Sequence, residues 1–274
     1  MDDAGYVRHL KQHLSEYRHR TLDVGSGQWG DPPRSYGHIL PINESHLNIV
    51  EPLREEFRVA QRAKGWTLHR YFHHLSSSQA LAFNLFLPVF PEVPASFAAT
   101  RGILGLRDEA AVDFEVVLPN GDGTNIDVLI SEGDDRRTVI EVKLTEAGFG
   151  RAKHDDRHLL KLSSLYAPLL RGRLADELLE PKAFFRDYQL FRQLAQLRPA
   201  TADRALLLLP RARSRLWKHA NTWCSQPGLG TFAGQITVVA LEDMLDALLS
   251  DARSTARGVA ASVATATKYL APAG

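Results

Sequence analysis

Two stretches of this sequence decide its fold: Asn125-Ile126-Asp127-Val128-Leu129-Ile130 and Ile140-Glu141-Val142-Lys143-Leu144. In both stretches apolar residues alternate with polar ones, and this period of two is typical of a β-strand whose successive side chains point to opposite faces of a sheet. Ile126, Val128 and Ile130 are therefore expected to share one face of the first strand. Ile140, Val142 and Leu144 are expected to share one face of the second.

The polar residues of these strands lie on the opposite face. If the strands are neighbours with these faces aligned, the carboxylates of Asp127 and Glu141 and the ammonium of Lys143 meet at one place. Two carboxylates can hold Mg²⁺, a hard cation that takes oxygen ligands and usually keeps several waters. The lysine could orient or help deprotonate an attacking water and offset charge on a phosphorane. The alternative is an amphipathic hairpin whose polar face meets solvent, with Glu141 and Lys143 as a weak surface pair.

A third strand is expected just upstream, over Ala111–Leu118, where apolar residues again alternate with polar ones. Pro119–Gly123 supplies the chemistry of a hairpin turn. Glu115 lies four residues before this turn and Asp127 four residues after it, so antiparallel pairing would bring the two carboxylates together. Close carboxylates repel each other unless a cation lies between them. Either a metal ion explains this cluster or one carboxyl is protonated.

The order of these acidic and basic residues on three consecutive strands, Glu115, Asp127 and Glu141-Val142-Lys143, resembles the PD-(D/E)xK nuclease superfamily. Two longer strings are similar to a bacterial restriction endonuclease-like branch: Ser77-Ser78-Gln79-Ala80-Leu81-Ala82-Phe83-Asn84-Leu85-Phe86 and Glu141-Val142-Lys143-Leu144-Thr145-Glu146-Ala147-Gly148-Phe149-Gly150. The similarity spans residues 75–193. It implies a restriction-endonuclease-like core in which Asp127 and Glu141 bind Mg²⁺, or alternatively Mn²⁺. Glu115 would support that ion or bind a second one, and Lys143 would assist the water.

Several further polar residues are candidates for support of the site. Ser76 or Ser77 is a good N-cap for a short buried helix over Ser78–Leu87, which carries Gln79 and Asn84. Buried amides need partners. These two either satisfy loop backbone or, as the resemblance suggests, hold the active-site strands or touch substrate.

Two residues that follow the motif strand complete this supporting set. Glu146 is expected beside the metal ligands. Related nucleases often place a Gln-bearing helix against the site, which here would be Phe184–Leu197 with Gln189, although no Tyr follows this Gln at four residues.

Contact with DNA must come from local basic groups, because 33 Lys and Arg residues against 32 Asp and Glu leave a net charge of +1 and no global attraction to nucleic acid. One candidate cluster follows the motif strand and the other follows an apolar strand: Arg151, Lys153, Arg157 and Arg211, Arg213, Arg215, Lys218. These side chains would contact phosphates, which fix position without reading sequence. The alternative for the first cluster is a solvated helix face balanced by Asp155 and Asp156.

The two ends of the chain differ in character from its middle. Tyr6, Leu10, Leu14 and Tyr17 lie at helical spacing, which predicts an amphipathic arm that packs on the body or on another subunit. Gly25–Pro41 is rich in glycine and proline and predicts a long loop. The last twenty residues are mostly Ala, Thr and Ser and suggest a frayed or swapped tail. We therefore expect an N-terminal arm over residues 1–74, a nuclease-like domain over 75–250 and a tail over 251–274.

The order of elements predicts an α/β fold with a mixed sheet flanked by helices. Its first strands are expected to be antiparallel, and its later ones to be joined by helical crossovers. Ala205–Leu209 is a short apolar run ended by Pro210, as expected of a strand that is covered on both faces. The 44% hydrophobic content is enough for a sizeable core.

Cysteine usage and hydropathy bear on the compartment. The single Cys224 excludes a disulfide framework within the chain and fits a reducing compartment. No signal-like segment or long apolar run is visible, so we expect a soluble cytoplasmic protein.

The sequence as a whole predicts a Mg²⁺-dependent DNA endonuclease of the restriction, genome-defence or repair type, with double-stranded DNA as the favoured substrate. Cutting both strands would call for a symmetric homodimer. The rival prediction is a nucleic-acid-binding or regulatory protein that keeps the nuclease-like fold but does not cut. An enzyme that acts on RNA is a third.

Overall fold

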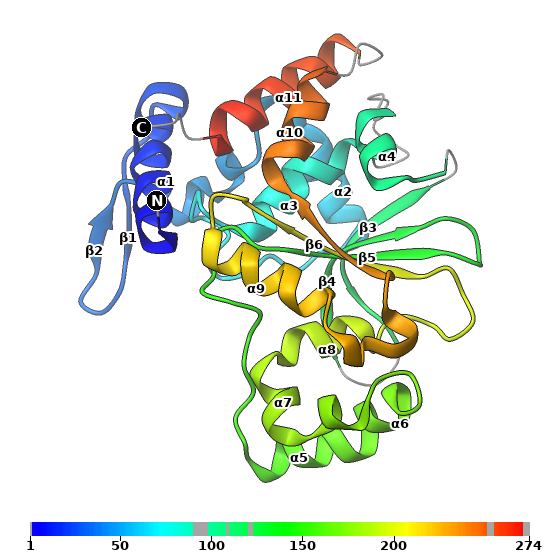
Figure 1. The fold of residues 1–274 in the computed structure, drawn as a ribbon. Helices are drawn as coiled ribbons and strands as arrows, with labels where there is room; N and C mark the ends of the chain where they lie inside the picture. Colours follow the sequence, from blue (N-terminus) through cyan, green and yellow to red (C-terminus); the bar gives the residue numbers. More distant parts are fainter. Residues whose placement is uncertain (1, 90–97, 108–109, 120–122, 251–254, 271–274) are drawn as a thin grey trace.

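A five-stranded sheet forms the centre of the molecule (Figure 1). The computed structural model describes residues 2–89, 98–107, 110–119, 123–250 and 255–270. The sheet consists, in spatial order, of β3 (Ala111–Val117), β4 (Asn125–Ser131), β5 (Arg137–Val142), β6 (Arg204–Leu209) and β7 (Ile236–Ala240). The pairs β3–β4 and β4–β5 are antiparallel, whereas β5–β6 and β6–β7 are parallel. The predicted mixed sheet is therefore confirmed.

Helices cover both faces of this sheet (Figure 1). One face packs on α1 (Asp3–Tyr17), α2 (Arg54–Lys64), α3 (Ser78–Phe86), α4 (Ala98–Leu104), α10 (Leu241–Ser250) and α11 (Ala256–Tyr269). The other packs on α5 (Asp156–Lys161), α6 (Ala167–Leu170), α7 (Pro181–Arg186), α8 (Tyr188–Leu194) and α9 (Ser214–Cys224). Short 3₁₀ and π turns join them: η1 (Arg18–Leu22), η2 (Ile42–Asn48), η3 (Glu51–Leu53), η4 (Leu87–Val89), η5 (Leu162–Tyr166), η6 (Asp176–Leu179) and η7 (Pro227–Phe232).

The two hydrophobic cores meet at β6, whose residues alternate between them. Leu206 and Leu208 belong to the core of the first face, and Leu207 belongs to that of the second. A strand with neighbours on both sides and helices on both faces has no polar surface to present, which explains its continuous apolar sequence. The prediction of a strand covered on both faces is confirmed.

The predicted alternation of β3 and β4 fails at one point. Phe114 and Val128 face the first core, but Val116 and Ile126, which pair with each other, pack against the second. Ile126 therefore does not share a face with Val128, contrary to expectation. The change of face on β3 coincides with Glu115, whose backbone is left-handed with a φ of 52°. A single left-handed residue breaks the period of two and turns the following side chains to the other face.

The amphipathic helix predicted at the N-terminus is confirmed. The four residues at helical spacing are all buried: Tyr6, Leu10, Leu14 and Tyr17. Asp2 caps the helix by accepting a hydrogen bond from the backbone N–H of Gly5 at 2.8 Å. The helix packs on the body of the same chain, where Asp3 lies 3.2 Å from the guanidinium of Arg213. The first core runs without a break across the expected boundary at residue 74.

The glycine-rich segment expected as a loop contains a small two-stranded sheet, β1 (Gly27–Trp29) and β2 (Arg34–Tyr36). Gly27 donates a hydrogen bond to the carbonyl of Ile39 at 2.7 Å. A Cβ at this position would lie 2.1 Å from the carbonyl oxygen of Leu40, so the glycine permits a close backbone approach. Gly27 is therefore needed for the tight packing of this hairpin, and the prediction of a loop over the whole segment is wrong.

The C-terminal segment is a helix, so the expectation of a frayed or swapped tail is wrong for its described part. Thr255 caps α11, and Ala261, Ala266 and Tyr269 lie in the first core. The buried Nζ of Lys268 donates a hydrogen bond to the side chain of Asn48 at 2.5 Å. Small residues bury little area, so the hydrophobic period of such a helix is hard to read from sequence.

One helix prediction near the site needs a correction. Phe184–Leu197 was expected as one helix, but α7 and α8 are separated at Asp187, where φ is −120°. The carboxylate of Asp187 lies 2.8 Å from Arg186 and 2.9 Å from His219. The break follows from the use of this buried side chain for tertiary contacts rather than for helix continuation.

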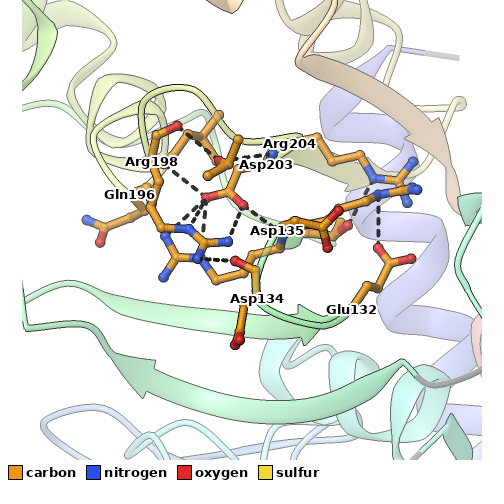
Figure 2. Close-up of polar contacts among 12 residues, drawn as sticks. Glu132, Asp134, Asp135, Gln196, Arg198, Asp203 and Arg204 are labelled. Atoms are coloured by element: carbon orange, nitrogen blue, oxygen red, sulfur yellow. Dashed lines mark hydrogen bonds and ion pairs between the residues drawn. The ribbon is translucent and has the colours of Figure 1, made fainter.

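An ionic network lies where β5 begins and β6 approaches it (Figure 2). Asp203 is buried and accepts hydrogen bonds from the backbone N–H of Arg137 at 2.8 Å and from the guanidinium of Arg198 at 2.8 Å. Burial acts to raise the pKa of Asp203, but the hydrogen bonds from Arg198 and the charge of Arg137 outweigh it and lower this pKa to about 2. Through Asp203, this network joins the first residue of β5 to the segment that precedes β6.

None of the helices in the described part of the chain combines the length and the apolar character that a membrane crossing needs.

Candidate active site

Glu141 and Lys143 form a buried ion pair near the end of β5. Lys143 Nζ lies 2.7 Å from Glu141 Oε1. Glu141 is 2% exposed and Lys143 is 7% exposed. They therefore do not form the solvated hairpin face that was the alternative prediction. A buried carboxylate of this kind needs partners for both oxygens.

Two glutamines of α8 supply these partners. Gln189 donates to Glu141 Oε1 at 2.5 Å and accepts a hydrogen bond from Lys143 Nζ at 2.9 Å. Gln193 donates to Glu141 Oε2 at 2.5 Å. Residues four apart lie on one face of a helix, which lets both amides reach the same carboxylate. Gln189 thus lies against the candidate site as expected, whereas Gln193 was not predicted. The Gln-x-x-x-Gln spacing is the signal that could have identified it.

Asp127 lies beside this pair, where β4 and β5 separate. The backbone ladder between the strands ends at Val128 and Ile140, and Asp127 Oδ2 then accepts a hydrogen bond from the backbone N–H of Val142 at 2.8 Å. The carboxylate thus replaces a main-chain partner in the ladder. Burial and the charge of Glu141 raise the pKa of Asp127 well above its ordinary value, although Lys143 and the bond from Val142 oppose this shift.

The surrounding charges are coupled to one another. Burial acts to lower the pKa of Lys143, but the carboxylates of Glu141, Glu146 and Asp127 outweigh it and raise this pKa. Lys143 is therefore a fixed cation at neutral pH. Burial also raises the pKa of Glu115, against hydrogen bonds from Gln79 and Asn125, the latter at 3.3 Å. The carboxyl groups of the cluster therefore outnumber its one ammonium, that of Lys143.

A cavity of about 630 Å³ opens in front of Asp127. One wall carries Glu115, Asp127 and Glu146, whereas the buried pair of Glu141 and Lys143 does not line it. Most of the other lining residues come from the N-terminal region and the start of α3. The full lining comprises Trp29, His69, Tyr71, His74, Ser76, Ser77, Ser78, Gln79, Glu115, Asn125, Asp127, Thr145 and Glu146. The N-terminal residues of this set were not predicted, because nothing in the sequence links them to the motif strands.

The two amides of α3 have different positions. Gln79 lines the cavity, accepts a hydrogen bond from the backbone N–H of His69 at 2.8 Å and donates to the carbonyl of Thr67 at 3.0 Å. Asn84 lies in the first core, where it accepts from the backbone N–H of Val50 at 2.9 Å and donates to Tyr269 Oη at 3.0 Å. Both amides satisfy loop backbone. Gln79 alone also touches the candidate site, so the alternative of a site role does not hold for Asn84.

Glu146 holds the loop after β5. Its Oε2 accepts hydrogen bonds from the backbone N–H groups of Leu144 at 2.7 Å and Thr145 at 3.0 Å. This arrangement places the carboxylate at the cavity wall and within electrostatic reach of Lys143. The expectation that Glu146 lies beside the other acidic residues agrees with this placement.

The two predicted basic clusters approach each other at a second cavity, of about 670 Å³. Arg151 from the first cluster and Arg215 from the second both line it, together with Arg186 and His219. The segment 145–148 separates this basic cavity from the acidic one, because Thr145 and Glu146 line one and Ala147 and Gly148 line the other.

Arg213 does not belong to this basic surface, which corrects its expected contact with DNA. Its side chain is buried and donates to the carbonyls of Leu144 at 3.1 Å and Glu146 at 2.8 Å, besides its contact with Asp3. Arg211 is exposed and pairs with Asp243 at 2.5 Å. The remaining members of both clusters are exposed: Lys153, Arg157 and Lys218. Asp155 caps α5, so part of the predicted charge balance is used for capping.

Among the residues that the structure describes, no three carboxylate, imidazole or thiol groups are gathered into a complete set of metal ligands. Mg²⁺ commonly binds through one or two carboxylates and keeps several waters. Of the carboxylates of the motif strands, Asp127 lines the cavity and Glu141 does not.

The family model described as "Restriction Endonuclease associating with ARP" matches residues 10–262 of this chain. The match covers the sheet, the acidic cluster and both cavities, and it extends beyond the segment 75–193 on which the resemblance rests. No curated protein and no solved structure is similar enough to the chain to count as a match.

Proposed function

Because the chain belongs to the family of restriction endonucleases associating with ARP, we propose that it hydrolyses DNA phosphodiester bonds with the help of Mg²⁺. The observation that carries this proposal is the cluster of Asp127, Glu141 and Lys143 beside an acidic cavity. The cluster has the residue order of the PD-(D/E)xK nucleases. Its burial and its shared charges distinguish it from a chance match of surface residues.

The residues fit a divalent cation. Burial and neighbouring carboxylates raise the pKa values of Asp127 and Glu115, which means that the ion-free cluster lacks positive charge. Asp127 and Glu141 would hold the ion, and Glu115 would support it from the cavity wall or bind a second one. When bound, Mg²⁺ would supply a Lewis acid for a phosphoryl oxygen and a water of lowered pKa. Mn²⁺ has similar ligand preferences and could replace it.

Lys143 contributes charge rather than base catalysis in this proposal. Its raised pKa keeps it protonated, so it would not remove a proton from water. Its Nζ is held between Glu141 and Gln189 at 2.7 and 2.9 Å. A cation fixed in this way would stabilise negative charge that develops on the phosphate, at no cost of reorganisation.

The glutamines of α8 act as positioning residues. Each oxygen of Glu141 accepts one hydrogen bond from Gln189 or Gln193, which fixes the plane of the carboxylate. A carboxylate oxygen can accept a second partner. Oε1 already has one in Lys143 Nζ at 2.7 Å, so Oε2 is the oxygen that would bind an ion. Groups that orient metal ligands typically affect activity 10- to 100-fold.

The left-handed backbone of Glu115 also supports a functional role for this region. A non-glycine residue in this conformation costs about 1–2 kcal/mol, and such strain is found most often at functional sites. Here the conformation accompanies the change of face on β3, and the Glu115 side chain lines the cavity.

We propose that the basic cavity receives the DNA backbone next to the scissile phosphate. Arg151 and Arg215 line it, and Lys153, Arg157 and Lys218 are exposed on the neighbouring elements. A symmetric dimer would place two such sites on the two strands of a duplex. Sedimentation of the protein with and without duplex DNA would test this part of the proposal.

A cleavage assay tests the proposed function directly. Plasmid and single-stranded DNA are incubated with the protein in Mg²⁺, in Mn²⁺ and in chelator, and Asp127→Asn is compared with Asp203→Asn, which removes a charge outside the site. We expect cleavage that needs the divalent ion and that Asp127→Asn alone abolishes in the folded protein. Nicking that persists in chelator, or in Asp127→Asn, would overturn the proposal. DNA binding without any cleavage would favour the rival role of a nuclease-fold binding or regulatory protein.

A further inference from the structure

The part of the acidic cavity that comes from the N-terminal region forms an aromatic wall. Trp29 and Tyr71 line this wall with ring centroids 4.8 Å apart and planes at 74°, and His74 lies 5.3 Å from both rings. Trp29 is 36% exposed. A large aromatic residue at this exposure, inside a cavity that also holds carboxylates, is unusual for a site that binds phosphate alone.

The polypeptide fixes this wall firmly. Leu40 donates to the carbonyl of His73 at 2.9 Å, and Leu75 donates to the carbonyl of His38 at 3.0 Å, so the strand after the hairpin is tied to the segment that carries Tyr71 and His74. Gly27 packs closely against Leu40, and this contact fixes the position of Trp29, two residues after Gly27. The guanidinium of Arg70 lies 4.4 Å from the Tyr71 ring and 6.0 Å from that of Trp29. The rings therefore form a preorganised corner with a cation at its rim.

Hydrogen-bonding groups accompany the rings. His74 Nε2 is buried and has no hydrogen-bond partner among the described residues. Burial and the neighbouring histidines lower the pKa of His74 to about 4, so the imidazole is neutral and can either donate or accept. Gln79, Asn125 and the hydroxyls of Ser76 and Ser78 lie on the same cavity surface. Flat rings with adjacent amide and imidazole groups match the chemistry of a nucleobase, which has a π-face and a polar edge.

On these observations we propose that the cavity is a subsite for an unpaired nucleobase that stacks on Trp29, with the edge of the base against Tyr71, beside the phosphate to be cut. The inference rests on the proposed function and narrows its substrate to DNA in which a base next to the scissile bond is single-stranded, mismatched or extruded. The volume of about 630 Å³ accommodates such a group. A base inside a regular duplex cannot reach this wall without unpairing, and unpairing is easiest where pairing is already absent.

Binding can be measured apart from cleavage. Asp127→Asn protein is titrated with a single-stranded oligonucleotide that carries 2-aminopurine and with a blunt duplex of the same sequence, and both base fluorescence and anisotropy are recorded. Trp29→Ala is expected to weaken single-strand binding about 5- to 100-fold, the usual effect of removing one stacking ring. Trp29→Phe should restore most of it. Tyr36→Ala is the matched control, because Tyr36 has a similar exposure of 37% on the same hairpin and does not line the cavity.

The outcomes separate this inference from the proposed function. Single-strand binding that Trp29→Ala leaves unchanged, or that falls equally for the blunt duplex and in Tyr36→Ala, would overturn the inference even if the wild-type protein cleaves DNA. A selective loss in Trp29→Ala would support it even if the wild-type protein cleaves nothing. Absence of any binding to the single strand would overturn it as well. Thermal unfolding of Trp29→Ala and Trp29→Phe checks that the hairpin stays folded.

Discussion

Strand β5 carries a buried charge cluster at each end, and the two clusters are built on opposite principles. At its start, Asp203 is surrounded by the guanidinium groups of Arg137 and Arg198, and its pKa falls to about 2. At its other end, the carboxylates of Asp127 and Glu141 share the single ammonium of Lys143, and the pKa of Asp127 rises. One cluster is saturated with positive charge, and the other lacks it.

The difference teaches how a structural and a chemical site can be told apart within one fold. A saturated cluster leaves the carboxylate no capacity for a ligand, and breaking it exposes the full cost of a buried charge. An unsaturated cluster stores repulsion that a cation can relieve, and perturbed groups of this kind are candidates for function. The predictions that follow test whether stability belongs to the first cluster and activity to the second.

The largest expected effect concerns activity. Asp127→Asn and Glu141→Gln keep the shape of each side chain and remove its charge, so cleavage should fall by about 10³-fold or more. Asp203→Asn, the same change at the other end of β5, should leave the rate per folded molecule unchanged. Single-turnover cleavage at saturating protein measures all three. Equal losses at both ends would erase the distinction between the clusters.

The second effect concerns stability and has the reverse pattern. Asp203→Asn leaves Arg137 and Arg198 without their buried counter-charge and is expected to cost about 3–5 kcal/mol in the free energy of unfolding. Urea denaturation gives this value. Asp127→Asn should cost little or nothing in the absence of divalent ions. Glu141→Ala should resemble Asp203→Asn instead, since it removes the carboxylate that pairs with the buried Lys143. A Glu141→Ala protein as stable as the wild type would contradict the described pair.

A third prediction tests the glutamine frame. Gln193→Leu removes one of the hydrogen bonds that fix Glu141 and replaces the amide with an apolar side chain of similar size. We expect kcat to fall about 10- to 100-fold with little change in KM. A variant that is less stable but has an unchanged kcat would show that Gln193 contributes to packing and does not position Glu141.

The fourth prediction uses pH, and the two clusters should respond in opposite directions. The pKa of Asp127 in the folded protein lies above its unfolded value of 3.8. The contribution of Asp127 to the free energy of unfolding is therefore fully present below pH 3.8 and is lost as pH rises through the folded pKa. Without divalent ions, Asp127→Asn should therefore unfold at a higher temperature than the wild type at pH 8, by about 2–4 °C. Added Mg²⁺ should remove this difference in unfolding temperature. A wild type that unfolds at a higher temperature than Asp127→Asn without divalent ions would contradict repulsion between the carboxylates.

Asp203 supplies the reference for that pH series. Its folded pKa of about 2 lies below the unfolded 3.8, so its contribution is present above 3.8 and is lost as pH falls through about 2. The difference in stability between the wild type and Asp203→Asn should thus shrink between pH 4 and pH 2. Thermal unfolding scans over this window measure it, and a difference that stays constant would mean that Asp203 acts by packing rather than by charge.

The smallest expected effect concerns DNA binding. If about four exposed basic groups meet phosphates, affinity should fall with salt at a log–log slope of about −3.6. Arg151→Gln and Arg215→Gln should each reduce this slope by about 0.9, whereas Arg62→Gln, exposed on α2, should not. Anisotropy titrations at several salt concentrations measure the slope. Unchanged slopes in both cavity variants would place the DNA elsewhere on the protein.

Much of this molecule could be predicted from its sequence, because short-range patterns control much of it. The strands, their pairing directions and the meeting of Asp127, Glu141 and Lys143 follow from a period of two and from turn chemistry. The reversal of faces at Glu115 could not be predicted, since no pattern announces a left-handed backbone at a non-glycine residue.

Tertiary contacts account for the other differences. Gln193, Trp29 and Arg213 acquire their roles from segments far away in the sequence. Whether a given arginine faces solvent or a buried carbonyl depends on which element covers it. A cluster of basic residues in sequence is therefore weaker grounds for a DNA surface than a cluster of carboxylates on adjacent strands is for a metal site.

The buried guanidinium of Arg213 has a consequence for anyone who expresses or edits this gene. It joins Asp3, near the start of the chain, to the carbonyls of Leu144 and Glu146 in the loop between the two cavities. A start codon chosen only a few positions downstream would delete Asp3. Arg213 would then lose its counter-charge, and its hold on the loop would weaken. Loss of activity in such a shortened protein would then be a fault of assembly, even though every residue of the acidic cluster was still encoded.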